Sequence, residues 1–497
     1  MIKTPKDNLI LRAPVVVVLG HIDHGKTTLL DFIRKSRVAE KETGGITQHV
    51  GAYEIEQKGK KITFIDTPGH EAFSQIRSRG AHTADIAVLV VDATESVKTQ
   101  TKEAISHIKK AEIPIIVAIN KMDKSEANPE KVKRELIRED ITVESMGGKV
   151  PSVEVSAKTG KGVPDLLELI LLIAEMENLK TNTSKSAEGV IIEAFQDSKR
   201  GAIATLLINE GRLKVGQIVG TESALGKVKG LADFRGKAIK EALPSQPVIM
   251  MGFGKVPWVG ESFRVFETFE EAENNLKKEK ELGPETIDLQ DDQKIFNLIL
   301  KTDVLGSLEA LEEILRALPQ ERIVLRILKS EVGEVNESDI KSASQAKAKI
   351  LAFRVKTNAV AQNLAERERV RIMNFEIIYE LVEGVRKYME KLVEPEIVRK
   401  DLGKLKVLVV FLTEKNRQIV GGKIVEGEVK KGQVFIEVLR NNEIKGTGRM
   451  INLQKNKKDV DRATKGDECG ILYEGDIKIE QGDIVVFYNK ERIKPEI

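Results

Sequence analysis

One short segment restricts the possible folds more than any other part of the chain. Residues 20–27 read G-H-I-D-H-G-K-T, which fits the phosphate-binding pattern G-x-x-x-x-G-K-[ST]. An apolar run over residues 15–19 precedes the segment, and a helical pattern begins at Lys26. The glycines allow backbone N–H groups to surround phosphate oxygens, and a helix N-terminus favours the anion. The segment therefore predicts a nucleoside-phosphate site between a strand and a helix.

Each residue type in this loop suggests a role. Lys26 is expected to reach the β- and γ-phosphates, and the Thr27 hydroxyl to ligate Mg²⁺. Asp23 either helps to hold a monovalent cation or hydrogen-bonds the loop, and the two histidines are either structural or catalytic. The candidate nucleotide contacts here are Gly20, His21, Ile22, Asp23, His24, Gly25, Lys26 and Thr27.

Three further motifs follow in the order that a GTPase requires, each after an apolar strand. A carboxylate at Asp66 can hold a Mg²⁺-bound water, and the Gly69 N–H can sense the γ-phosphate. Asp123 offers two acceptor oxygens to the N–H donors of guanine, a pair that adenine lacks. These candidates are Asp66, Thr67, Pro68 and Gly69, then Asn120, Lys121, Met122 and Asp123, and finally Ser156, Ala157 and Lys158. Ligands of open α/β sheets bind at the carboxyl edge of the strands, where all four motifs are expected.

The chain is predicted to contain both α/β and β domains. Residues 12–180 alternate short apolar strands with helical patterns, which is typical of a mostly parallel sheet covered on both faces. Strands are expected at residues 15–19, 62–65, 86–91, 115–119 and 153–155. After a polar linker (181–187), we expect a β-barrel at 188–268, a connector at 269–292, a small α/β domain at 293–374, a linking helix at 375–394 and a second β-barrel at 396–497. The two β-rich zones could share one architecture.

Composition excludes several classes of protein. Among 497 residues, 80 are Lys or Arg and 77 are Asp or Glu, so the net charge of +3 rules out a histone-like polycation. A single cysteine, Cys469, excludes an intrachain disulfide and a multi-cysteine zinc site. No uncharged apolar run approaches the length of a membrane span. We therefore expect a soluble, cytoplasmic protein, monomeric and without a membrane partner.

Several longer segments resemble the bacterial translation initiation factor 2 family of translational GTPases. These are residues 20–27, 44–53 (G-G-I-T-Q-H-V-G-A-Y), 66–73 (D-T-P-G-H-E-A-F), 79–85, 200–205, 226–231, 301–310 (K-T-D-V-L-G-S-L-E-A) and 466–471 (G-D-E-C-G-I). They cover nearly the whole chain in the domain order of the family. The long N-terminal extension of the family is expected to be absent, because Gly20 lies almost at the start.

The resemblance implies further roles. Thr47, with Gly45 and Ile46, would close over Mg²⁺ and the γ-phosphate, and His70 would orient the attacking water when the ribosome docks. The alternative for His70 is a capping role at a helix start. The C-terminal barrel would bind formylmethionyl initiator tRNA through Gly466, Glu468, Cys469 and Gly470, although Cys469 could instead be a buried core residue. The implied activity is ribosome-dependent GTP hydrolysis, with both ribosomal subunits as partners.

Two other classes of protein remain as alternatives. An elongation-type tRNA carrier should continue with a second β-barrel after the first, whereas residues 296–392 have a βα pattern. A non-translational P-loop protein, such as a metabolic enzyme or a membrane-remodelling GTPase, should carry a second catalytic constellation or an amphipathic membrane segment. Ribosome binding separates these alternatives.

Overall fold

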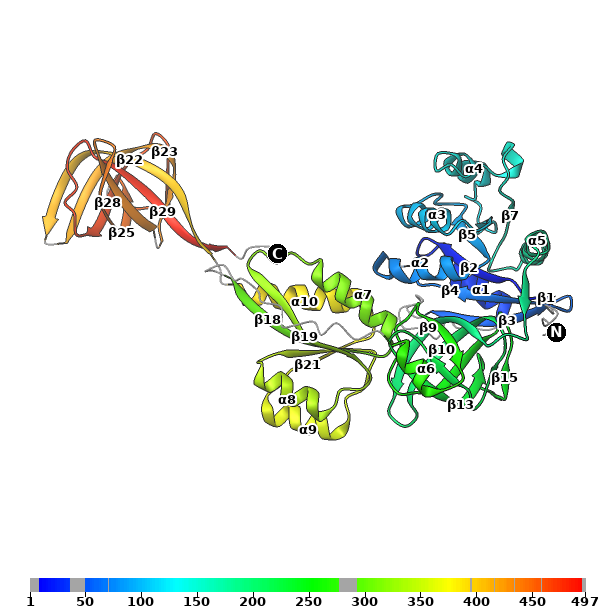
Figure 1. The fold of residues 1–497 in the computed structure, drawn as a ribbon. Coiled ribbons are helices and arrows are strands. Elements are labelled where there is room, and N and C mark those ends of the chain that lie inside the picture. Colours follow the sequence, from blue (N-terminus) through cyan, green and yellow to red (C-terminus); the bar gives the residue numbers. More distant parts are fainter. Residues whose placement is uncertain are drawn as a thin grey trace, which may run out of the picture. The chain divides into compact units, whose positions relative to one another are not determined.

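A computed structural model gives the fold (Figure 1). It describes residues 9–35, 50–69, 71–276, 293–393, 396–414, 416–432, 434–456 and 458–493. By internal contacts the chain divides into two compact units, Met1–Arg386 and Lys387–Ile497. No helix within the described ranges is both long and apolar enough to cross a membrane.

The first part of unit one is built on a six-stranded sheet in the order β3-β4-β2-β5-β6-β7. The edge strand β3 is antiparallel to β4, whereas all other neighbours run parallel. The strands are β2 (Val15–Gly20), β3 (Gly51–Gln57), β4 (Lys60–Asp66), β5 (Ile86–Asp92), β6 (Ile115–Asn120) and β7 (Ser152–Glu154). All parallel strands therefore present their carboxyl ends at one edge.

Helices cover both faces of this sheet because its central strands are apolar on both sides. Alternate residues of β2 belong to two different cores: Val17 packs with α3 and α4, and Val18 packs with α1 and α5. The helices are α1 (Lys26–Arg34), α2 (Ser74–Thr83), α3 (Thr99–Ala111), α4 (Pro129–Ile137) and α5 (Val163–Met176). The predicted α/β class with a covered, mostly parallel sheet is confirmed.

A closed β-barrel follows. Its ring runs β12-β17-β9-β10-β16-β13 and returns to β12. The ring strands are β9 (Glu188–Asp197), β10 (Gly201–Glu210), β12 (Ile218–Gly220), β13 (Leu225–Asp233), β16 (Pro247–Phe253) and β17 (Ser262–Phe266). Three short strands lie outside the ring: β11 (Leu213–Lys214), β14 (Ala238–Ile239) and β15 (Glu241–Ala242).

The second α/β part contains a parallel sheet in the order β19-β18-β20-β21. Its strands are β18 (Lys294–Thr302), β19 (Ile323–Val332), β20 (Lys349–Phe353) and β21 (Ile372–Phe375). Its helices are α7 (Leu305–Arg316), α8 (Glu337–Gln345), α9 (Ala359–Glu368) and α10 (Ile378–Leu392). Helix α10 is amphipathic, and Leu381, Val385 and Met389 on one face are buried.

Unit two is a second closed barrel with the ring β22-β29-β24-β25-β28-β23, which returns to β22. The ring strands are β22 (Glu396–Glu414), β23 (Arg417–Lys430), β24 (Val434–Arg440), β25 (Glu443–Lys455), β28 (Glu468–Gly475) and β29 (Ile484–Ile493). Two short strands, β26 (Lys458–Asp459) and β27 (Arg462–Thr464), attach to it. Numbered in chain order, the ring strands of both barrels follow the same cycle, 1-6-3-4-5-2. The two β-rich zones therefore share one architecture.

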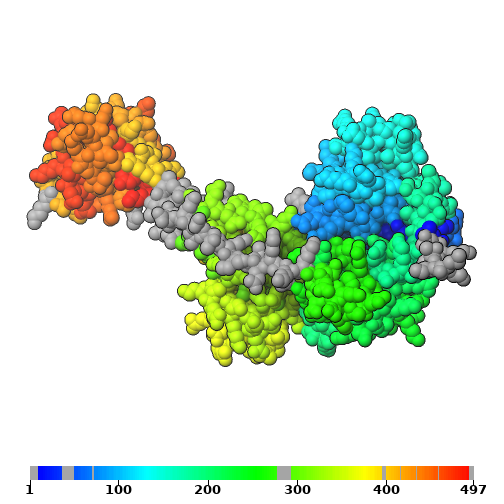
Figure 2. All heavy atoms as spheres, in the orientation of Figure 1, coloured from blue at the N-terminus to red at the C-terminus, as the bar shows by residue number. Residues whose placement is uncertain are grey.

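Polar contacts join the parts of unit one. Thr63 of β4 donates from its hydroxyl to the carbonyl of Ser245 in the first barrel, at 2.5 Å. On α2, Arg79 forms an ion pair with Glu309 of α7, with 2.5 Å between nitrogen and oxygen. Figure 2 shows the atoms of the first sheet domain, in blue and cyan, against those of the first barrel, in green.

Several sequence-based boundaries were wrong. The predicted linker 181–187 begins inside strand β8 (Lys180–Asn182), which pairs with β1 (Leu9–Leu11). The linking helix was expected from residue 375, but Phe375 ends β21 and pairs with Phe353. The connector was expected to be helical or mobile, and it begins with a short helix, α6 (Phe269–Asn274). Residues 277–292 of the connector lie outside the described residues.

Candidate nucleotide-binding site

The phosphate-binding loop leaves the sheet at the end of β2 and enters α1 at Lys26. Two glycines allow this path. Gly20 has φ 147°, and a Cβ there would lie 2.3 Å from the carbonyl oxygen of Val90. Gly25 has φ 88°, and its Cβ would lie 2.4 Å from the side-chain nitrogen of Asn120. Larger residues would therefore displace the loop from the sheet edge.

Lys26 lies inside the loop, with only 6% of its surface exposed. Its ammonium group donates to the carbonyl oxygens of Gly20, at 2.9 Å, and His21, at 2.7 Å. Burial lowers the pKa of Lys26 to about 8. A Cβ on Gly69 would lie 2.5 Å from Nζ of Lys26. The structure thus brings the D-T-P-G turn against the predicted phosphate-binding lysine.

The D-T-P-G residues follow β4 and are held on both sides. Asp66 and Thr67 are buried, and the Thr67 hydroxyl donates to the carbonyl oxygen of Val18 at 3.1 Å. On the other side, Arg77 of α2 donates to the carbonyl oxygen of Pro68 at 3.0 Å. Hydroxyl and carboxylate oxygens, such as those of Thr27 and Asp66, are the hard ligands that Mg²⁺ prefers. The residues present therefore fit a magnesium ion bound together with nucleotide phosphates.

The N-K-M-D and S-A-K segments meet beside the loop. Asn120 donates to the carbonyl oxygen of His24 at 2.9 Å and accepts from the Ala157 amide at 2.9 Å, so one side chain joins three motifs. The Ser156 hydroxyl donates to Asp123 at 2.6 Å, which lowers the pKa of that carboxyl group. Asp123 is exposed and ionised at neutral pH, so it can accept hydrogen bonds from a base.

The remaining members of these segments have structural contacts or are exposed. Lys121 has φ 64° and forms an ion pair with the buried Asp92, at 2.6 Å. The Met122 amide donates to the carbonyl oxygen of Val155 at 3.2 Å. Lys158 is exposed. The structure thus places the described residues of all four predicted motifs at one edge of the sheet.

The two loop histidines differ in exposure but are both neutral at pH 7. His24 is fully buried, its Nδ1 lies 3.4 Å from the carbonyl oxygen of Val90, and burial lowers its pKa to about 3. The pKa of His21 is also lowered, mainly by burial. Their rings meet edge to face with centroids 5.0 Å apart. This packing favours the structural interpretation of both residues. Asp23 has φ 62°, a conformation that is uncommon for a residue with a side chain.

Four predicted site residues lie outside the described part of the chain. They are Gly45, Ile46, Thr47 and His70.

The motif analysis missed three residues that support the site. Gln100 accepts from the Ile22 amide at 3.0 Å, Asp92 binds Lys121, and Arg77 binds Pro68. Asp92 ends an apolar strand, as Asp66 does, so its position was a usable signal. Arg77 offered none, because a cation within an amphipathic helix is usually exposed.

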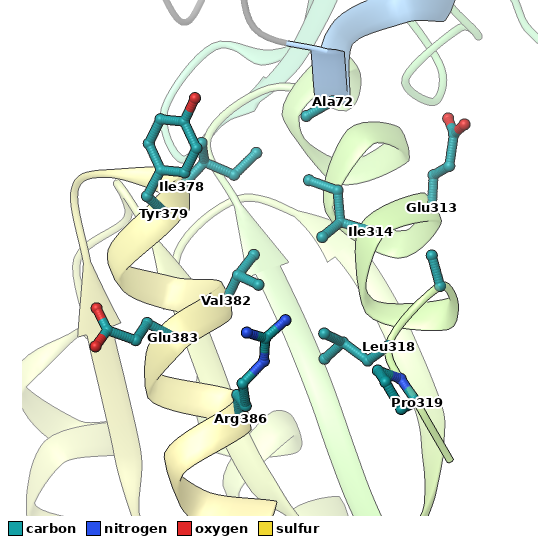
Figure 3. A pocket seen from close by; sticks show the side chains of 11 residues that line it. Ala72, Glu313, Ile314, Leu318, Pro319, Ile378, Tyr379, Val382, Glu383 and Arg386 are labelled. Atoms are coloured by element: carbon teal, nitrogen blue, oxygen red, sulfur yellow. The ribbon is translucent and has the colours of Figure 1, made fainter. Parts of the chain in front are cut away.

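A cavity of about 620 Å³ opens between α7 and α10 of the second α/β part. Ile314 and Leu318 approach it from the α7 side, and Tyr379, Val382 and Arg386 from α10 (Figure 3). Ala72, two residues after His70 in the chain, lies at one end. The segment that follows the turn therefore borders the second α/β part directly.

The candidate residues of the C-terminal barrel point in different directions. Cys469 lies in β28 within the barrel core, is 6% exposed, and burial raises its pKa to about 11. Its neighbour Glu468 is exposed, and a Cβ on Gly470 would meet nothing within 4 Å. Gly466 occupies a turn with φ 98°. The burial of Cys469 favours the core-packing interpretation.

Three family models match successive stretches of the chain. Residues 11–176 match the family model of the elongation factor Tu GTP binding domain, residues 186–266 match elongation factor G domain 2, and residues 270–386 match translation-initiation factor 2. An archaeal structure, GDP-bound aIF5B from Aeropyrum pernix, is 27% identical with a TM-score of 0.47, and the match covers 96% of this chain and 92% of that chain.

Curated relatives match almost the whole chain. Translation initiation factor IF-2 of Halothermothrix orenii is 43% identical over 99% of this chain and 74% of the relative. The protein of the same name from Thermotoga sp. strain RQ2 is 43% identical over 98% of this chain and 73% of the relative. The chain is thus a GTPase of the translational type, and it belongs to the translation initiation factor IF-2 family.

Proposed function

We propose that this protein places formylmethionyl initiator tRNA on the small ribosomal subunit, promotes joining of the large subunit, and then hydrolyses GTP to GDP and phosphate. The observation that carries the proposal is the match to IF-2 proteins over nearly the whole chain. A nucleotide site assembled at one sheet edge supports it. The protein would act as a monomer in the cytoplasm, with both ribosomal subunits as partners.

The phosphate side of the site would bind and sense GTP. Lys26 would exchange its two carbonyl partners for β- and γ-phosphate oxygens, which are stronger acceptors because they are charged. Thr27 and, through a water, Asp66 would hold Mg²⁺, which neutralises charge on the phosphates when bound. The Gly69 amide would contact the γ-phosphate.

The family resemblance suggests roles for the residues that respond to GTP hydrolysis. Thr47, with Gly45 and Ile46, would close over Mg²⁺ and the γ-phosphate in the GTP state and open after hydrolysis, an order–disorder switch. His70 would orient the attacking water. Asp23, next to the phosphate loop, would help to hold a monovalent cation there.

The base side would select guanine. Asp123 would accept from the two N–H donors of guanine, and its Ser156 partner fixes the carboxylate in position. The Ala157 amide lies in the same cluster, held by Asn120, and the neighbouring backbone would donate to the guanine carbonyl. An adenine base would leave these groups unpaired, which disfavours it by several kcal/mol, on the order of 10⁴-fold.

The C-terminal barrel would bind the aminoacylated end of the initiator tRNA. Gly466, Glu468 and Gly470 would contribute at its surface, whereas Cys469 would act through packing or at the edge of the pocket. Two lysines of the surrounding surface are already paired: Lys455 with Asp467 at 2.6 Å and Lys431 with Asp459 at 3.2 Å. We therefore expect few free phosphate contacts.

Ribosome co-sedimentation tests the proposal most directly. The protein should sediment with ribosomes in the presence of a non-hydrolysable GTP analogue and dissociate with GDP. His70→Ala should keep GTP affinity within a few-fold and reduce ribosome-stimulated single-turnover hydrolysis by about 10²-fold or more. Nucleotide-independent sedimentation would contradict the switch, and a wild-type rate for His70→Ala would contradict the role of that residue.

A further inference from the structure

Arg77 is a fully buried cation in the first turns of α2. A buried charge destabilises a fold unless it is paired and hydrogen-bonded. Its Nη2 lies 2.6 Å from Oε1 of Glu103 on α3. This ion pair attaches α2, the helix that follows the D-T-P-G turn, to the neighbouring helix.

Glu103 is a fixed anchor for this cation. Partial burial acts to raise its pKa, but hydrogen bonds from His107, Ser74 and Arg77 lower it to about 2. His107 Nε2 lies 3.3 Å from the same carboxylate oxygen, and Ser74 Oγ lies 3.2 Å from that ring nitrogen. The carboxylate thus stays charged and oriented at any pH at which the protein works.

The second nitrogen of the guanidinium, Nη1, donates to the carbonyl oxygen of Pro68 at 3.0 Å. That carbonyl belongs to the same peptide unit as the Gly69 amide. The unit is planar and trans, so its C=O and N–H groups point in opposite directions. By holding the carbonyl, Arg77 sets the direction of the Gly69 N–H. A charge-assisted bond at the carbonyl also polarises the peptide, which makes its N–H a stronger donor.

The turn held in this way already lies against the phosphate-binding loop. A Cβ on Gly69 would lie 2.5 Å from Nζ of Lys26 and 3.3 Å from the Ile22 amide nitrogen. The turn is therefore closed towards the lysine that would bind the γ-phosphate, rather than withdrawn from it.

We propose that Arg77 is a positioning residue that holds the Pro68–Gly69 peptide in the orientation in which the Gly69 amide meets the γ-phosphate. The proposal rests on the assignment of Gly69 as the γ-phosphate sensor under the proposed function. Arg77 then contributes to the preference for GTP over GDP, because GDP has no γ-phosphate for this amide. It touches neither nucleotide.

A purely structural role would make a different prediction. If Arg77 only tied α2 to α3, its loss would lower the melting temperature and leave the ratio of GTP to GDP affinity unchanged. A matched control is available in the same domain. Arg12 forms a two-pronged ion pair with Asp85, at 2.6 and 2.5 Å, and neither residue belongs to the nucleotide motifs. Arg12→Met should lower stability without changing the ratio.

The test measures affinities of the full chain for GDP and for a non-hydrolysable GTP analogue. Arg77→Met removes the charge, and Arg77→Lys keeps it but cannot reach Pro68 and Glu103 at once with a planar fork. In both, we expect GDP affinity within about twofold of wild type and affinity for the analogue lower by on the order of tenfold, the loss expected for one charge-assisted bond. Should Arg77→Met fail to fold, Arg77→Lys and Glu103→Gln carry the test.

Gly69→Ala, measured in parallel, tests the sensor role of Gly69 separately from the positioning role of Arg77. Its Cβ would collide with Lys26, so affinity for the GTP analogue should fall. If Gly69→Ala binds the analogue normally, the sensor assignment is wrong and the role of Arg77 with it. If Gly69→Ala loses the analogue while the Arg77 variants keep the wild-type ratio, or shift it towards GTP, only the role of Arg77 is overturned.

Discussion

At the residue scale, the phosphate loop combines buried titratable groups with an unusual backbone path. The loop carries a buried lysine and a fully buried histidine within three positions of the chain. The pKa of each side chain is lowered, mainly by burial. The free energy of unfolding therefore depends on pH, and the sign of each pKa shift determines whether it falls or rises as the pH is lowered.

We predict that His24 makes the protein less stable in mild acid. Its pKa is about 3 in the folded protein and about 6.5 when unfolded, so the unfolded chain binds a proton first as the pH falls. The contribution of His24 to stability is fully present above pH 6.5 and decreases by about 1.4 kcal/mol per pH unit below it, so about 2 kcal/mol is lost by pH 5. Denaturant unfolding of wild type and His24→Asn at pH 7 and pH 5 measures the difference. Equal losses in both proteins would contradict the assignment.

We predict that Asp123→Asn reverses base preference. The substitution replaces an acceptor with a donor at the guanine edge, and losing two charge-assisted bonds should weaken GTP binding by roughly 3–6 kcal/mol. Xanthosine triphosphate should bind the variant better than GTP, because its additional carbonyl accepts from the new amide. Titration of both nucleotides decides the matter. A variant that still prefers GTP would show that Asp123 does not read the base.

At the element scale, sequence patterns predicted the helices and strands that carry a local apolar or glycine pattern. They missed strands that form only by pairing with a segment far away in the chain. The phosphate loop and its flanking strand and helix were predictable because glycine spacing and apolar runs act locally. Strand β8 was missed because its residues are polar and its partner β1 lies about 170 positions away in the chain. Phe375 was assigned to a helix because its apolar neighbours fit a helical period, whereas pairing with Phe353 makes it a strand end.

Some missed elements did carry a local signal. Lys58 and Gly59 have φ 51° and 78°, which is the two-residue hairpin turn that joins β3 to β4. The alternation of Tyr53 and Ile55 before it indicates a strand with one buried face. For the site, the four motifs predicted candidate nucleotide contacts, and their described residues lie at one edge of the sheet. The supporting contacts of Arg77 and Gln100 needed the fold, because helix packing decides which polar side chains reach the loops.

The direction of side chains in β28 gives a prediction for the C-terminal barrel. Cys469 points into a packed core, where a Leu side chain would have to displace its neighbours, so Cys469→Leu should destabilise the barrel by about 1–3 kcal/mol. Gly470→Ala is the matched control, because its added methyl meets open space and should leave the melting temperature unchanged. Both variants are assayed for melting temperature and initiator-tRNA affinity. A stable Cys469→Leu barrel with weakened tRNA binding would instead place Cys469 in the aminoacyl pocket.

At the scale of the whole molecule, the chain is organised as two compact units. The nucleotide motifs, the first barrel and the second α/β part all belong to unit one, and the second barrel forms unit two. The division falls within α10, in which Leu381 before the division and Met389 after it are both buried. A cut that keeps α10 intact should therefore preserve unit one.

We predict that a protein ending at Val393 keeps GTP binding but loses initiator tRNA. All candidate nucleotide residues precede this point, and the proposed tRNA surface follows it.

Conversely, the isolated barrel from residue 396 should bind formylated, aminoacylated initiator tRNA more tightly than deacylated tRNA. Its salt dependence should be shallow, because ion pairs with Asp467 and Asp459 already neutralise Lys455 and Lys431, so binding of phosphates releases fewer counterions there. Calorimetry with nucleotide and filter binding with tRNA test both halves against the full chain. Undiminished tRNA binding by the shortened protein would place the tRNA site in unit one.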